Sequence, residues 1–415
     1  MDGEAHIGKL DRKALEQIPP ALQATVDAGD LSGFVTLVWS RGEVVQVNTI
    51  GRRDIAADKP MTRDTLFRIA SMTKPITSVA ALMLMEEGKL ALEDPITRWA
   101  PEFSNMRVLK DPAGPVEDTV PAARDITIED LMTHRSGLAY GFTSLGPIAH
   151  AYEAALGAPL LGPFGPDEWM RRLGELPLTY QPGERFHYSH ATDVLGFIVA
   201  RIEGKSLGEV LKARILDPLG MGDTGFWARP ENADRLARLY KAPAEGGPLK
   251  DVSYPPEPEP PVFEAGGGGL ISTADDYLRF ARMLLGRGEL DGVRLLKPET
   301  VDLMTTNRLT DAQREVPFMG IPFWLGQGFG LGLSVITDPE KQSWMGAGSK
   351  GAFGWPGAFG TWWQADPAQD LVLIYLIQNS MELGPEAASQ LATGQRMGAR
   401  AALPVFQKLV YGALG

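Results

Sequence analysis

The sequence reads Ala70-Ser71-Met72-Thr73-Lys74-Pro75, and an apolar run from Ile76 to Met85 follows it. Pro75 has no backbone N–H to donate, so it fits only the first turn of a helix. The run after it is apolar on nearly every side, which is typical of a helix enclosed by protein, and Gly88 is a stop signal. This stretch therefore predicts a buried helix that carries Ser71 and Lys74 at its mouth.

Ser71 and Lys74 are three residues apart, so on a helix they share one face. The Ser71 N–H would be one of the free donors at the helix start, near the positive end of the helix dipole. A hydroxyl, an amine and a free N–H at one point are the parts of an acyl-transfer nucleophile. Ser-x-x-Lys is a short pattern, however, and a capping serine beside a solvated lysine would satisfy it as well.

Composition and charge exclude several classes of protein. The 415 residues include no cysteine, which excludes disulfides, thiol nucleophiles and cysteine-bound metals. The net charge of −12 argues against a nucleic-acid surface and favours a neutral or cationic ligand. No apolar run approaches the roughly 18 residues of a membrane span. The start, Met1-Asp2-Gly3-Glu4, lacks the basic and apolar regions of a secretory signal, so we expect a cytoplasmic protein.

Strand-like runs occur at both ends of the chain. Residues 34–39 and 44–50 are rich in β-branched side chains and flank a turn at Arg41-Gly42, which predicts a hairpin, and strand character returns between residues 329 and 377. We therefore predict an α/β sheet domain from residues 1–94 and 265–415, built from both chain termini. We predict that residues 95–264 form a mainly helical domain, with a Gly- and Pro-rich flap at about 141–170.

Local signals mark several helix ends and one close contact. Thr127 to Asp130 resembles a capping box, entering a short helix that contains His134 and closes at Gly137. The run Gly266 to Gly269 predicts a close backbone approach, and Ser272 is expected to cap the next helix. A single histidine inside a helix is more often structural than catalytic.

Three further patterns point to other chemistry. Gly346 to Gly351 satisfies G-x-G-x-x-G, but β-prone residues follow it where a dinucleotide site needs a helix. His187, His190 and Asp193 could form a metal site, but His187 precedes the expected helix and does not share its face. Ser206 lies in a G-x-S-x-G pattern that lacks the preceding strand and the later histidine of a nucleophile elbow. We predict no metal and no cofactor, and we interpret Ser206 as a helix cap.

Three separated motifs and several longer phrases resemble one known family. Ser71-x-x-Lys74 is followed by Tyr188-Ser189-His190 and then by Trp355-Pro356-Gly357. With these motifs the chain resembles the serine β-lactamase and penicillin-binding fold, class C-like branch, and within it the family VIII carboxylesterases. The similarity runs through most of the chain and includes residues 67–74, 131–138, 218–221 and 267–274. The resemblance implies a β-lactamase-like fold, with an antiparallel sheet flanked by helices.

The resemblance also implies a role for each motif residue. Ser71 is the nucleophile, and Lys74 and Tyr188 together form its general base. Lysine and tyrosine both have reference pKa values of about 10, so their mutual placement has to make one of them a base. The N–H groups of Ser71 and Ala358 would form the oxyanion hole.

Two motif positions depart from the β-lactamase pattern and bear on substrate. His190 replaces the asparagine of the Tyr-x-Asn motif, and Trp355-Pro356-Gly357 replaces Lys-Thr-Gly. We expect His190, Trp355 and Gly357 to contact the substrate. Trp355 offers an apolar face and no charge, so neutral esters should gain and anionic β-lactams should lose a partner.

The expected function is a carboxylesterase that cleaves small, short-acyl esters through a Ser71 acyl-enzyme. We expect β-lactam hydrolysis to be weak or confined to cephalosporin-like compounds. Acyl transfer to an acceptor other than water is an alternative, and so is a β-lactam- or peptide-binding protein without turnover. The expected partner is a small ester, and the natural ester and the oligomeric state stay open.

Overall fold

The computed structural model describes residues 10–157, 163–243, 247–254, 259–343, 345–380 and 398–415. An eight-stranded antiparallel sheet forms its centre, in the order β12-β13-β14-β15-β16-β1-β2-β3. The strands are β1 (Gly33–Ser40), β2 (Glu43–Asp54), β3 (Lys59–Pro60), β12 (Gln327–Phe329), β13 (Ser334–Ile336), β14 (Phe353–Gly354), β15 (Trp362–Asp366) and β16 (Leu371–Leu376).

Strands β1 and β16 join the two ends of the chain within this sheet. Val35 pairs with Leu376, and Ser40 pairs with Leu371, in one antiparallel ladder. All eight residues of β1 are buried, because helices cover both of its faces. Successive side chains alternate between the faces, so Phe34 packs in one hydrophobic cluster and Val35 in the other. The predicted antiparallel sheet, built from both termini and flanked by helices, is confirmed.

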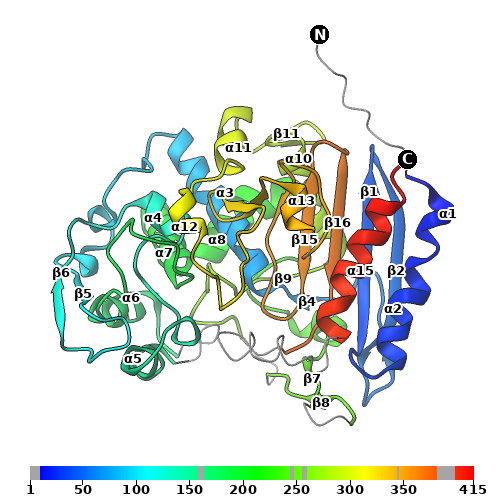
Figure 1. Cartoon of the computed structure of the whole chain (residues 1–415), viewed down its shortest axis with the longest axis horizontal. Helices are drawn as coiled ribbons and strands as arrows, with labels where there is room; N and C mark the ends of the chain where they lie inside the picture. Colours follow the sequence, from blue (N-terminus) through cyan, green and yellow to red (C-terminus); the bar gives the residue numbers. More distant parts are fainter. Residues whose placement is uncertain (1–9, 158–162, 244–246, 255–258, 344, 381–397) are drawn as a thin grey trace.

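Helices from both termini cover one face of the sheet, at the right of Figure 1. They are α1 (Arg12–Leu15), α2 (Ile18–Asp27) and α15 (Gly398–Gly412). The two N-terminal helices are separate pieces because Pro19 lies in the first turn of α2, where a proline is tolerated. Leu22 and Phe406 are fully buried there and belong to the same cluster as Tyr375 of β16.

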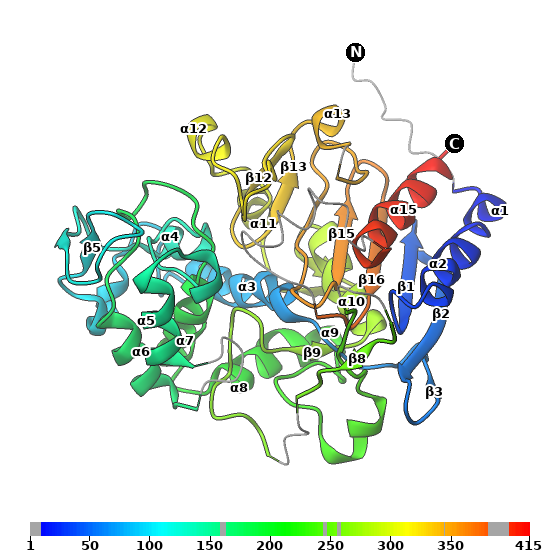
Figure 2. The ribbon, with the colours of Figure 1, turned by 60° about the horizontal axis from the view of Figure 1, so that its bottom comes forward.

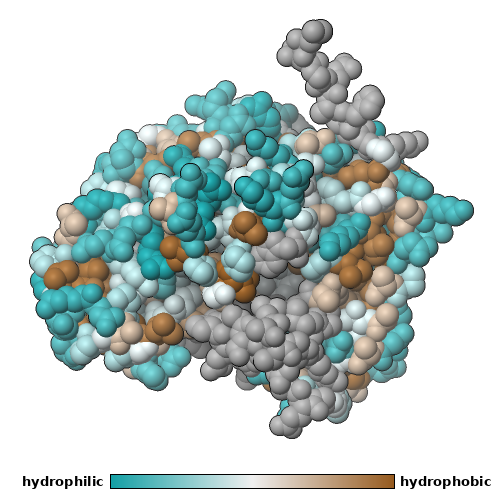
Figure 3. Space-filling view, in the orientation of Figure 1, coloured by the Kyte–Doolittle hydropathy of each residue, from teal (hydrophilic) through white to brown (hydrophobic). Residues whose placement is uncertain are grey.

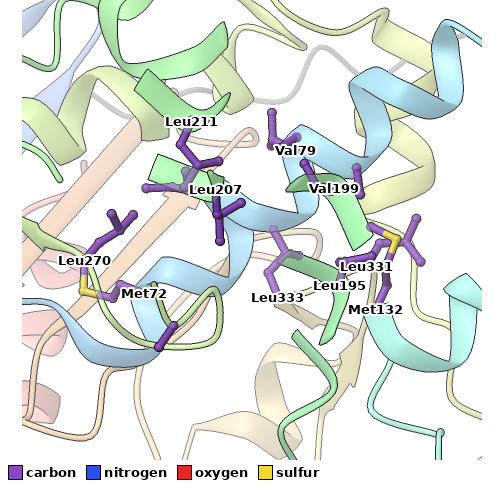
Figure 4. Packing of buried hydrophobic residues seen from close by; sticks show 14 of the residues in the cluster. Met72, Val79, Met132, Leu195, Val199, Leu207, Leu211, Leu270, Leu331 and Leu333 are labelled. Carbon is purple, nitrogen blue, oxygen red and sulfur yellow. The ribbon is translucent and has the colours of Figure 1, made fainter. Parts of the chain in front are cut away.

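Two helices, α10 (Ala274–Leu285) and α3 (Thr73–Glu86), pack on the other side of the sheet. Most residues of α3 are buried, and Gly88 with a φ of +70° follows the end of the helix. Figure 4 shows apolar side chains of neighbouring helices, among them Leu195 and Leu207, gathered around this helix. The predicted buried helix after Ser71 is therefore confirmed.

The chain between α3 and β9 (Ile271–Ser272) is mainly helical, and much of it lies on the side of α3 away from the sheet (Figure 2). Its helices are α4 (Ile128–Met132), α5 (Pro147–Leu156), α6 (Pro166–Gly174), α7 (Ala191–Glu203), α8 (Leu207–Leu211) and α9 (Asp217–Leu219). Its short strands are β5 (Arg107–Leu109), β6 (Thr119–Pro121), β7 (Tyr240–Lys241) and β8 (Lys250–Asp251). The division of domains near residues 94 and 264 stays a prediction.

The remaining elements are short. They are β4 (Phe67–Arg68), β10 (Glu289–Leu290), β11 (Val293–Arg294), α11 (Pro298–Met304), α12 (Asp311–Arg314) and α13 (Pro339–Gln342). The face seen in Figure 3 is mostly hydrophilic, and a brown patch lies over the terminal helices. Within the part of the chain that the structure describes, no helix has the length and apolar character needed to cross a membrane.

The segment 141–170, expected to be an irregular Gly- and Pro-rich flap, holds α5 and the start of α6. Residues 158–162 of this segment lie outside the described part of the chain, and several of its described glycines and prolines stand at helix ends. Gly146 precedes Pro147 at the start of α5, and Gly165 precedes Pro166 at the start of α6. A proline in the first turn starts a helix, so these residues separate two helices where the sequence suggested a loop.

Three local expectations also shift. His134 lies outside α4, which ends at Met132, and its φ of +52° takes it out of the helix. Thr273 caps α10 in place of Ser272, because Ser272 belongs to β9. The first part of the region where strand character was expected, from residue 329, holds the end of β12 and then β13, with Gly332 at a φ of +91° in the turn between them.

Candidate active site

A strained turn presents Ser71 at the start of α3. The Ile69 N–H donates to the Leu270 carbonyl, which extends the pairing of β4 with β9. Ala70 then adopts a φ of +45°, which is uncommon for a residue with a Cβ and is found at sites where the surroundings hold the backbone. Ser71 lies in the 3₁₀ turn that follows, and Lys74 lies in the first turn of α3. The turn therefore places the serine directly before the helix, and the lysine within it.

Lys74 is fully buried, and its ammonium has three hydrogen-bond acceptors. Nζ lies 3.2 Å from Ser71 Oγ, 3.2 Å from Tyr140 OH and 2.6 Å from the Gly267 carbonyl oxygen. An ammonium has three N–H donors, so this set can satisfy all of them and offsets the cost of removing the charge from water. The alternative of a solvated lysine is wrong.

Tyr188 contacts both Lys74 and Trp355. Lys74 Nζ is 4.5 Å from the centroid of the Tyr188 ring, a distance at which a cation is attracted to an aromatic face. The Trp355 Nε1–H donates to the Tyr188 OH over 3.1 Å. Trp355 is 1% exposed, and the Tyr188 hydroxyl is the acceptor of its single N–H. The fold thus brings together Ser71, Lys74, Tyr188 and Trp355 from three distant stretches of the chain.

His190 is connected to Lys74 through two intermediates. Its Nδ1 lies 2.8 Å from Asp193 Oδ2, and Asp193 Oδ1 accepts the Gly267 N–H over 2.7 Å. The Gly267 carbonyl in turn accepts from Lys74. A Cβ on Gly267 would stand 2.9 Å from Asp193 Oδ1, so the predicted close backbone approach of the glycine run is confirmed. His190 is 3% exposed, and its expected contact with substrate stays a prediction.

His187 faces away from this arrangement. Its ring lies 5.0 Å from the Tyr180 ring, while His190 and Asp193 bond to each other. In the described ranges, no three histidine, aspartate or glutamate side chains are grouped so that they could hold a metal ion. Burial and the nearby Arg185 guanidinium lower the pKa of His187 to about 4, so it is neutral near pH 7.

The neutral His134 ring packs against the Tyr188 ring. Its ring centroid is 4.6 Å from that of Tyr188, and Nδ1 lies 3.3 Å from Ser189 Oγ. Burial, the Lys74 ammonium and His187 hold the pKa of His134 well below its usual value. Lys74 therefore faces no second positive charge from this histidine.

Tyr140 is a site residue that the motifs did not reveal. Its OH accepts from Lys74, its ring makes an edge contact with His190 at 4.3 Å, and the Tyr188 ring is 5.5 Å away. Burial, the Asp193 carboxylate and Tyr188 raise the pKa of Tyr140 well above its usual value, so it is a neutral phenol. The only sequence signal is its place two residues after Leu138, which ends one of the family-like phrases.

The segment after Trp355 docks on the turn that carries Ser71. A Cβ on Gly357 would stand 2.3 Å from the Ile69 carbonyl oxygen, which explains the glycine. Thr361 Oγ1 donates to the same carbonyl over 3.0 Å, and Ala358 packs in one cluster with Ala70. Within the described residues, neither the Ser71 N–H nor the Ala358 N–H has a hydrogen-bond acceptor, so both are free to donate. Their role as an oxyanion hole, and a contact of Gly357 with substrate, stay predictions.

Two competing patterns have structural explanations. Ser206 is the N-cap of α8, where its Oγ accepts the Glu209 N–H over 3.2 Å in a capping box. The run Gly346 to Gly351 is followed by β14, and the Ser349 N–H within it donates to Asp366 Oδ2. That run therefore lacks the following helix that binds a dinucleotide.

Comparison with known proteins identifies the family. A family model described as Beta-lactamase matches residues 20–392. The chain belongs to the β-lactamase family. It is 54% identical to a Mycobacterium tuberculosis protein over 95% of this chain and 98% of that protein. It is 34% identical to "Esterase EstB" of Burkholderia gladioli over 85% of this chain and 87% of the esterase.

A solved structure confirms the same fold. The structure titled "EstCE1, a hydrolase with promiscuous acyltransferase activity" aligns with a TM-score of 0.77 at 26% identity, over 94% of this chain and 99% of EstCE1. The resemblance to β-lactamase-like esterases is therefore confirmed, and this β-lactamase-family chain is a serine hydrolase whose relatives are esterases and acyltransferases.

Proposed function

We propose that the protein is a carboxylesterase that cleaves neutral esters through an acyl-enzyme on Ser71. The observation that carries the proposal is the contact of Ser71 Oγ with a fully buried Lys74, whose ammonium also lies against Tyr188. Serine is a weak nucleophile at neutral pH unless an adjacent base takes its proton. Lys74 and Tyr188 supply that base as one coupled unit.

The proposed reaction has two halves. In the first, the Lys74–Tyr188 pair reacts in the state that holds one proton fewer than an ammonium plus a phenol, and it takes the Ser71 proton while Oγ forms a bond to the ester carbonyl carbon. The N–H groups of Ser71 and Ala358 hold the oxyanion. The bond to the alkoxy oxygen then breaks, and the pair returns its proton to the leaving alcohol. In the second half the same pair activates water, which releases the acid and restores Ser71.

Trp355 supports neutral esters over anionic β-lactams. Its indole carries no charge, and its N–H is directed at Tyr188. A carboxylate on a substrate therefore finds no cation at this position, and binding it would require removing its charge from water without a partner. We propose that β-lactam hydrolysis is weak and confined to compounds such as cephalosporins.

Acyl transfer to an alcohol is the second candidate. An aromatic cluster surrounds Tyr188 and includes Tyr140, Phe186, Trp324 and Trp355. An apolar surrounding of this kind favours an alcohol acceptor over water, and the EstCE1 title names both activities for that protein. A binding protein without turnover is less well supported, because nucleophile and base are in contact.

The first experiment replaces Ser71 with alanine. Ser71→Ala should lower kcat/KM for p-nitrophenyl acetate by about 10³-fold or more, because the covalent intermediate can no longer form. Ser78→Ala is the matched control, since Ser78 is a buried serine of the same helix whose Oγ has no hydrogen-bond partner among the residues that the structure describes. Retained activity in Ser71→Ala, or an equal loss in both variants, would refute the proposal. Methanol added as acceptor should yield methyl acetate if acyl transfer competes with hydrolysis.

A further inference from the structure

A cavity of about 440 Å³ lies beside the candidate active site. Aromatic side chains form much of its wall: Phe226, Trp227, Tyr254, Phe263 and Phe359. The volume falls in the range of small-molecule pockets, and an apolar wall of this kind binds apolar groups. The sequence motifs point to none of these residues.

Chain neighbours of the site residues line this cavity, although Ser71, Lys74 and Ala358 themselves do not. Phe359 directly follows Ala358, and both pack with Ala70, the residue before Ser71. Gly268, on another part of the wall, directly follows Gly267, whose carbonyl accepts from Lys74. Tyr188 does not line this cavity, but it lines a smaller cavity of about 150 Å³ together with Phe142 and Phe318.

In the proposed reaction, the alcohol and the acyl chain of the ester extend to different sides of Ser71. When Oγ of Ser71 attacks, the carbonyl oxygen points to the N–H groups of Ser71 and Ala358. The alkoxy oxygen must then reach the proton held by the Lys74–Tyr188 pair, so the alcohol leaves on the Tyr188 side. The acyl chain extends to the other side, toward Phe359 and the larger cavity.

We infer that this cavity binds the acyl group of the ester, and that the preferred acyl groups are bulky, neutral and apolar, branched or ring-bearing. The inference rests on the proposed esterase function and replaces the expectation of short acyl chains. The cations at the wall are already engaged: Arg238 pairs with Asp251, and the Arg68 guanidinium lies 5.7 Å from the Tyr254 ring centroid. An anionic acyl group therefore has no free cation to bind on these two side chains.

The test compares two ester series on the wild-type protein. In the acyl series, p-nitrophenyl acetate, hexanoate and cyclohexanecarboxylate share one alcohol. In the alcohol series, phenyl and 1-naphthyl acetate share one acyl group. Each acyl methylene that enters the cavity should raise kcat/KM by about fourfold until the cavity is filled.

Variants that fill the cavity identify its occupant. Ala228 and Ala233 line it on an irregular segment and a 3₁₀ turn, so Ala228→Phe and Ala233→Phe add volume without entering the core. Either change should lower the cyclohexanecarboxylate-to-acetate ratio of kcat/KM by roughly tenfold or more. Ala56→Phe, at an exposed position near the β2–β3 turn, is the matched control and should leave the ratio unchanged.

Each other outcome has a stated meaning. If the filling variants change the naphthyl-to-phenyl ratio and leave the acyl ratio unchanged, the cavity binds the alcohol and the inference is overturned. Unchanged ratios in both series overturn it as well. Titration of reactive serine with a phosphonate counts the folded sites in each variant. If acetate hydrolysis survives Ser71→Ala, the esterase proposal itself fails; if it is lost while the ratios stay constant, only the acyl assignment fails.

Discussion

Lys74 contacts two buried phenols, and their surroundings make them different. The Tyr188 hydroxyl accepts the indole N–H of Trp355. Tyr140 lies near the Asp193 carboxylate, and burial together with that charge raises its pKa well above the usual value. Tyr188 therefore presents its ring face to Lys74 and its hydroxyl to Trp355, while Tyr140 stays a neutral phenol that accepts a hydrogen bond from the ammonium.

This difference predicts the effect of removing the Tyr140 hydroxyl. Tyr140→Phe leaves one N–H of the buried Lys74 without its acceptor, and such a loss at a charged group costs about 1–3 kcal/mol. We expect kcat/KM for p-nitrophenyl acetate to fall by about 10- to 100-fold, mainly through kcat, because Lys74 no longer holds its position against Ser71.

Tyr152→Phe is the matched control for this change. Tyr152 is also a buried tyrosine, and its OH accepts the Ala139 N–H without contacting Lys74. That variant should lose stability while kcat per active site stays within about twofold of the wild type. Equal kinetic losses in Tyr140→Phe and Tyr152→Phe would show that Tyr140 has only a packing role.

The sequence predicted the residues of the candidate site where the proposed chemistry requires a fixed pattern. Ser71, Lys74 and Tyr188 stand in motifs, and the structure brings them together. Tyr140 was missed because a phenol that accepts one hydrogen bond requires no pattern around it. The hydrogen bond of Trp355 was missed for a related reason, since residue type shows an available N–H but not its acceptor.

At the scale of elements, the sequence predicts helix caps better than it predicts where the chain turns between elements. The caps at Thr127 and Ser206 depend on residues three positions away, and both form as expected. Segment 141–170 was misread because glycine and proline occur both in loops and at helix ends. The split of β12 from β13 depends on sheet pairing, which the local sequence does not specify.

The cap at Ser206 gives a prediction that separates structure from catalysis. Ser206→Ala removes the acceptor for the Glu209 N–H at the start of α8, and loss of such a cap costs about 1 kcal/mol. We expect the urea midpoint to fall while kcat per active site is unchanged. Ser206→Thr keeps a capping hydroxyl and should retain most of the stability. A loss of activity by 10³-fold in Ser206→Ala would instead make Ser206 the nucleophile.

At the scale of the whole molecule, the sheet ties the two ends of the chain together. β1 and β16 pair with each other, and helices from both termini cover their outer face. Helix α3, which follows Ser71, and the candidate site lie on the opposite side of the sheet (Figure 2). Packing of the terminal helices should therefore control stability without entering the chemistry.

Phe406 of α15 tests this separation. Its side chain is fully buried and its ring centroid lies 5.8 Å from that of Tyr375 on β16. Phe406→Ala leaves a cavity between helix and sheet, which should lower the free energy of unfolding by about 3–5 kcal/mol. Val405→Ala is the matched control, because Val405 is 40% exposed on the same helix and should cost less than about 0.5 kcal/mol. Urea unfolding measures both, and phosphonate titration gives kcat per folded site, which should match the wild type. If Phe406→Ala is as stable as Val405→Ala, packing of the C-terminal helix does not stabilise the sheet. If the Phe406→Ala protein folds but its kcat per folded site falls, the two faces of the sheet are coupled.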